Sequence, residues 1–79
     1  MDYNEIIRII KTKVGNENKY IVEDLEECIL IGATGGEITA LVGKYLINLK
    51  SKNNEVYNIL ELDIKKYILS CKQMGLIIF

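Results

Sequence analysis

The stretch Glu37-Ile-Thr-Ala-Leu-Val-Gly-Lys-Tyr-Leu-Ile-Asn-Leu49 decides the fold class of this chain. Its large apolar residues recur at intervals of three and four, which is the period of one helix face and differs from the alternation of a strand. They are Ile38, Leu41, Val42, Tyr45, Leu46 and Leu49. Thr34 is a candidate N-cap, and Glu37 is placed to close a capping box on the Thr34 amide. The stretch therefore predicts an amphipathic helix over residues 36–49.

A second, smoother stripe lies on the opposite side of the same predicted helix. It consists of Ala40, Gly43 and Ile47, again spaced by three and four residues. Glycine inside a helix costs about 1 kcal/mol relative to alanine, so Gly43 indicates that another backbone comes close there. Two interpretations follow. Either this helix is the central one of the domain and is covered on both sides, or the stripe belongs to a homodimer or partner surface.

The rest of the chain predicts three more helices. Apolar residues follow helical spacing over about 3–13, 20–31 and 55–74, and no proline interrupts any of these ranges. We therefore expect one small domain, residues 1–79, of the all-α class. Its four helices would pack up-and-down or orthogonally around the helix over 36–49.

Polar and glycine-rich segments mark the expected connections. Residues 15–19 and 50–54 are polar linkers, and three glycines in residues 32–36 predict positive φ angles and a sharp change of direction. Asn58 with Glu61 is a second possible cap pair, so the last helix could begin with a separate turn. Gly75 is suited to end that helix, with Leu76 folding back on it, and the apolar tail 76–79 is expected to pack on the bundle.

Composition limits the chemistry that is available. There is no histidine, and Cys28 and Cys71 both fall on apolar helix faces, where we expect reduced core thiols. The sequence accordingly predicts no metal, no cofactor and no catalytic residues. The N-terminus has no basic region followed by an apolar one, and no apolar run is long enough to span a bilayer. The cytoplasm is the expected location.

Charge is distributed unevenly although the whole chain carries only −1. Residues 23–49 carry five acidic side chains against Lys44 alone, whereas residues 50–79 carry a net charge of +2. Four of the acids form a run in the helix predicted over 20–31, and Leu30 and Ile31 lie off its apolar stripe. The run comprises Glu23, Asp24, Glu26 and Glu27. It is either a solvated helix face or a contact surface for a basic protein.

Two nucleotide-related interpretations fit the sequence less well. The glycines of residues 32–36 lack the lysine and hydroxyl of a phosphate-binding loop, and Glu37 would repel a phosphate. The arrangement of two helices around this turn is also compatible with a helix-turn-helix. However, the second helix offers no Arg, Asn or Gln near its start to read bases, and the helix before it is acidic.

A small protein-binding module is therefore the leading hypothesis. Small inhibitors of nucleases, such as immunity proteins and antitoxins, share this size and charge, and the Ile-, Lys- and Asn-rich composition is typical of bacteria with AT-rich genomes. The contact surface would include the acidic run, Leu30 and Ile31. A DNA-binding or transcription-associated module and a structural homodimer are the alternatives.

Overall fold

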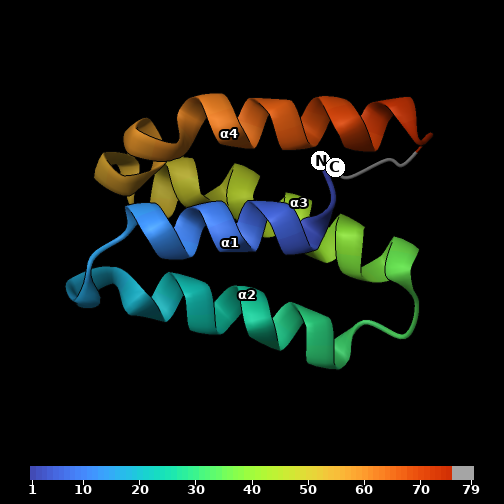
Figure 1. Cartoon of the computed structure of the whole chain (residues 1–79), viewed down its shortest axis with the longest axis horizontal. Helices are drawn as coiled ribbons and strands as arrows, with labels where there is room; N and C mark the ends of the chain where they lie inside the picture. Colours follow the sequence, from blue (N-terminus) through green and yellow to red (C-terminus); the bar gives the residue numbers. More distant parts are fainter. Residues whose placement is uncertain (76–79) are drawn as a thin grey trace.

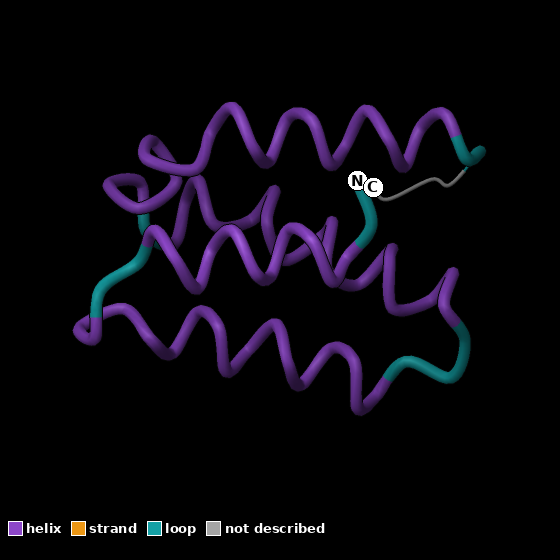
Figure 2. Tube along the Cα trace, in the orientation of Figure 1, coloured by secondary structure: helices purple, strands orange, loops and turns teal. Residues whose placement is uncertain are grey.

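The computed structural model describes residues 1–75 of the chain. This range contains four α-helices joined by short connections and has no strand (Figure 2). The elements are α1 (Tyr3–Lys13), the 3-10 turn η1 (Asn16–Asn18), α2 (Lys19–Ile31), α3 (Gly35–Lys52) and α4 (Asn54–Gln73). The predicted all-α class and all four predicted helices are thereby confirmed. The expected packing of Leu76 and of the tail 76–79 lies outside the described residues.

Side-chain caps begin three of the helices. The Asp2 carboxylate accepts a hydrogen bond from the Glu5 amide at 2.9 Å, and the Thr34 hydroxyl accepts one from the Glu37 amide at 3.1 Å. The Thr34 cap confirms the prediction from the sequence. The reciprocal half of the capping box differs, because the Glu37 carboxylate accepts from the Ala33 amide at 3.3 Å and not from Thr34. Each cap satisfies a backbone amide that has no partner inside its helix.

The predicted linker over 50–54 is wrong. α3 continues to Lys52, and Asn53 alone separates it from α4. The Asn53 amide donates to the Leu49 carbonyl at 2.7 Å, and its side chain accepts from the Val56 amide at 3.2 Å. One residue thus ends one helix and caps the next, so no separate turn forms at Asn58. Lysines near the end of α3 suit the negative pole of its dipole.

The glycine-rich turn is also built differently from the prediction. Gly35 and Gly36 are the first two residues of α3, and Gly32 has a φ of −75°. Among the described residues only Gly75 has a positive φ. Gly32 is instead required by space, since a Cβ there would lie 2.5 Å from the Ile38 Cγ1 and 3.2 Å from the Cys28 carbonyl oxygen.

The four helices run up-and-down, each antiparallel to the one before it (Figure 1). α3 contacts all three other helices, which confirms its predicted central position. α1 does so as well, and the two lie between α2 and α4, which make no contact with each other in the described structure. The outer sides of α2 and α4 therefore form two opposite edges of the molecule.

An aliphatic core fills the space between the helices. α3 contributes six buried residues: Ile38, Thr39, Val42, Gly43, Leu46 and Leu49. Leu41 and Tyr45 of the predicted stripe are only half-buried, at the edge of the core. The buried side of α3 is thus rotated from the predicted stripe towards Thr39 and Gly43.

One buried hydrogen bond joins α4 to α3 inside this core. The Tyr67 side chain is fully buried, and its hydroxyl donates to the Thr39 carbonyl at 2.8 Å. Burial raises the pKa of Tyr67 well above its ordinary value, so this hydroxyl stays protonated and remains a donor. It is a directional contact between the two helices in a core made mainly of non-directional apolar contacts.

Replacing Tyr67 by Phe should lower the free energy of unfolding by about 1 kcal/mol, because the buried hydrogen bond is lost while the ring remains. For a domain of this size that corresponds to a decrease in Tm of about 4–8 °C, measurable by circular dichroism. The matched control is Tyr3→Phe, because Tyr3 is half-buried and its hydroxyl has no partner among the described residues. An equal loss in both variants would contradict a specific contribution of the Tyr67 hydroxyl.

Replacing Gly32 by Ala should destabilise the domain by about 1–3 kcal/mol, because the new Cβ forces Ile38 or the backbone to move. Gly35→Ala provides the control, since a Cβ there meets nothing within 4 Å. Reduced freedom of the unfolded chain should leave that variant as stable as the wild type or more stable, by up to about 1 kcal/mol. Urea unfolding measures both, and a tolerated Gly32→Ala would show that the turn is not closely packed.

Candidate binding surfaces

The outer face of α2 combines negative charge with exposed aliphatic side chains. We define it as Tyr20, Glu23, Glu27, Leu30 and Ile31, which recur at the three- and four-residue spacing of one helix side. Leu30 is 84 % exposed and Ile31 63 %. The structure thus brings together five neighbouring residues of which four were predicted as contact residues, and Tyr20 extends the face towards the start of α2.

The four acids of the predicted run do not share one environment. Glu26 forms an ion pair with Lys11 of α1 at 3.1 Å. Asp24 is half-buried and accepts a hydrogen bond from the Tyr45 hydroxyl of α3 at 2.7 Å. Glu23 and Glu27 are exposed and have no partner within residues 1–75. Only these last two are directed entirely to the outside.

Asp24 has a structural contact at the junction of α2 and α3. Partial burial and the hydrogen bond to Asp24 both raise the pKa of Tyr45 above its ordinary value, so the tyrosine remains a donor at neutral pH. The amino group of Lys52 lies 5.5 Å from the centre of the Tyr45 ring. Asp24 therefore holds α2 against α3 rather than standing free for a partner.

The second predicted stripe is not a continuous surface. Gly43 is buried, as the interpretation of α3 as a covered central helix predicts. Ala40 and Ile47 are half-buried. Ile47 faces α4 and lines a hollow there, which separates it from the outer face of α2.

Sequence reasoning did not identify a second exposed face, on α4. Leu62 is 74 % exposed, Ile59 57 % and Leu69 56 %, and two exposed lysines lie among them. We define the outer face of α4 as Ile59, Leu62, Lys65, Lys66 and Leu69. The sequence pattern does indicate this face, because residues 59, 62, 66 and 69 are spaced by three and four on the side of the helix opposite the buried stripe.

A hollow of about 430 Å³ adjoins this face between α3 and α4. Among the described residues it is lined by Ile47, Tyr57, Ile64, Lys65, Ile68, Leu69 and Lys72. Its walls are mainly aliphatic, with lysines at its rim. Such a hollow can accept an apolar side chain but brings no reacting groups together.

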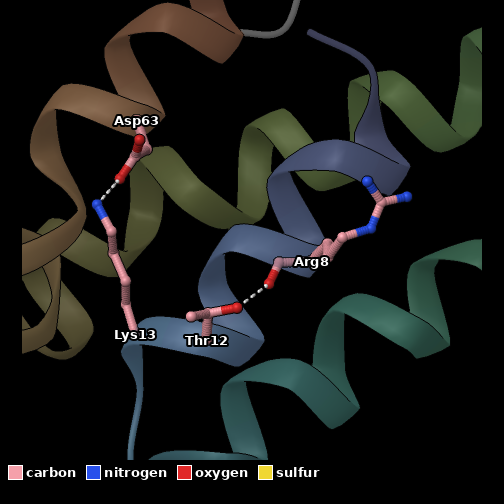
Figure 3. A network of polar contacts seen from close by, with 4 residues as sticks. All are labelled: Arg8, Thr12, Lys13 and Asp63. Carbon is pink, nitrogen blue, oxygen red and sulfur yellow. Dashed lines mark hydrogen bonds and ion pairs between the residues drawn. The ribbon is translucent and has the colours of Figure 1, made fainter.

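The closest polar contact between helices joins the end of α1 to α4 (Figure 3). The Lys13 amino group at the end of α1 is 2.6 Å from the carboxylate of Asp63 on α4, whose side chain is only 15 % exposed. The Thr12 hydroxyl donates to the Arg8 carbonyl at 3.0 Å, and the Arg8 guanidinium points away from the ion pair. The ion pair ties α1 to α4, whereas the Thr12 hydrogen bond lies within α1.

The described residues contain no group of His, Cys, Asp and Glu side chains that could hold a metal ion. No helix among them is long and apolar enough to cross a membrane. Comparison of the chain with protein-family models, with curated proteins and with solved structures finds no match.

Cys28 and Cys71 are both buried, as predicted, and form no disulfide. Burial raises the pKa of each thiol, and Asp24 and Glu27 raise that of Cys28 further. At about pH 8 the native thiols should therefore react with a disulfide reagent far more slowly than a free cysteine, since only the thiolate attacks. Both should react at once in denaturant. Rapid labelling of either thiol in the native protein would show that it is not buried.

Proposed function

We propose that this protein is a small binding module that uses the outer face of α2 to contact a basic protein partner. The observation that carries the proposal is the position of Glu23 and Glu27, exposed and without partners in the described chain, beside Leu30 and Ile31. Exposed Glu residues alone are typical of a solvated face. Two neighbouring, largely exposed aliphatic side chains are not required by such a face.

The two kinds of side chain would contribute differently to binding. Fully burying a leucine or isoleucine is worth about 1.5–3 kcal/mol. An exposed ion pair is worth only about 0.2–1 kcal/mol. Leu30 and Ile31 would therefore determine how long the complex lasts, while Glu23 and Glu27 would speed the encounter and exclude acidic partners.

An inhibitor of the immunity or antitoxin type is the form of binding module that we favour, in the cytoplasm of a bacterium. Enzymes that act on nucleic acid carry positive surfaces to hold phosphates. An acidic helix face with an aliphatic end complements such a surface in charge, and the size of the domain suits an inhibitor. No catalytic residue is needed for this function.

The geometry does not favour the alternative of a helix-turn-helix DNA-binding module. Its recognition helix would be α3, which is in contact with all three other helices. The exposed start of α3 consists of Gly35, Gly36 and Glu37, and these residues offer no donor side chain to a base edge. The outer face of α2, next to this end, would repel phosphates.

The double substitution Glu23→Lys and Glu27→Lys should reduce the association rate with the partner at least about tenfold at low salt, because favourable steering becomes repulsion. Leu30→Ala with Ile31→Ala should mainly increase the dissociation rate. The partner is first isolated on the immobilised wild-type protein from an extract of the native host. Both rates are then measured with the purified partner by surface plasmon resonance.

The matched control is Glu17→Lys with Glu55→Lys, which changes the net charge equally at exposed positions outside the face. Its association rate should stay within about threefold of the wild-type rate, since distant charges are screened. Equal decreases in association rate in the two charge-reversed double variants would show that overall charge, and not the α2 face, causes the effect. Unchanged association and dissociation rates in both α2 double variants would show that this face is not the binding surface.

A further inference from the structure

The outer faces of α2 and α4 are complementary to each other. Each combines exposed aliphatic side chains with two exposed charges, and the charges have opposite signs. Glu23 and Glu27 stand on α2, and Lys65 and Lys66 stand on α4. Lys65 has an internal partner, Glu61, but that contact is 3.7 Å long and exposed on both sides. Such a pair is weak enough to exchange for another carboxylate.

The two faces cannot meet within one molecule. α2 and α4 lie at opposite edges of the domain, with α1 and α3 between them, and they make no contact (Figure 1). Each molecule therefore presents Glu23 and Glu27 on one side and Lys65 and Lys66 on the other. A second copy of the chain carries both the carboxylates and the lysines that such a contact requires.

We propose that the outer face of α2 binds the outer face of α4 of a second copy, so that copies associate head-to-tail. This inference rests on the proposed function, because it takes the lysines on α4 of a second copy as the basic surface that the α2 face binds. Leu30 and Ile31 of one copy would lie against Leu62 and Leu69 of the next. The hollow beside Leu69 offers space for one aliphatic side chain to insert.

Charge disfavours the symmetric alternatives. Pairing two α2 faces would bring Glu23 and Glu27 against their own copies, and pairing two α4 faces would do the same with Lys65 and Lys66. Like charges placed opposite each other oppose association, whereas the α2-to-α4 pairing joins opposite charges. The preferred contact is therefore between two different faces.

A contact between different faces has a consequence for the size of the assembly. A pair of bound copies still has one free α2 face and one free α4 face, at its two ends, so association does not stop at two unless a ring closes. Because a single helix face is a small interface, the contact should be weak and should depend on concentration. Added salt should weaken it further.

Sedimentation velocity of the full chain from about 10 µM to about 1 mM at low salt tests the proposal. The wild type should shift from monomer to species larger than a dimer. Glu23→Lys with Glu27→Lys should remain monomeric, and so should Lys65→Glu with Lys66→Glu. An equimolar mixture of the two variants should associate again, because each supplies the charge that the other has lost. Circular dichroism checks that both variants fold.

Three results would overturn the proposal. The wild type could remain a monomer at all concentrations, its mass could stop at a dimer that survives both charge reversals, or the mixed variants could fail to associate. None of these three results by itself contradicts the proposed function. The wild type could stay monomeric while Glu23→Lys with Glu27→Lys abolishes binding to a different purified protein. In that case the partner is that protein, and self-association is rejected. If the wild type self-associates as described, the α2 face has its partner.

Discussion

The structure depends on one constraint: α3 has to bury its apolar side against three helices at once. Ile38, Val42, Leu46 and Leu49 are all buried, and burying each fully is worth about 1.5–3 kcal/mol. A domain of this length is expected to have a net stability near the lower end of about 5–15 kcal/mol. The free energy gained by burying this side of α3 is therefore comparable with the whole free energy of unfolding. Removing any of the other three helices would expose part of this side.

Covering α3 in this way leaves α2 and α4 at the edges. Each is covered on one side only, because α1 and α3 occupy the space between them. Aliphatic residues on their outer sides, such as Leu30 on α2 and Leu62 on α4, cannot reach the core. The same packing that stabilises the domain thus leaves the outer faces of α2 and α4 exposed on opposite sides of the molecule.

Local patterns were enough to predict the fold, whereas the surfaces needed tertiary information. Helical spacing and the caps at Asp2 and Thr34 act within a few residues, so they can be read from the chain. The polar end of α3 was mistaken for a linker because lysine and serine are as acceptable in a last helical turn as in a loop. Which acids of α2 stay free depends on Lys11 and Tyr45, which come from other helices.

Native-state hydrogen exchange, followed by NMR through increasing denaturant, tests the central position of α3 most directly. The amides over residues 42–49 should exchange only through global unfolding, with an opening free energy equal to that of the whole domain. The amides at the outer ends of α2 should exchange through smaller openings. Faster exchange in the middle of α3 than in α2 would contradict the account, because the helix that all others cover would then open before its cover.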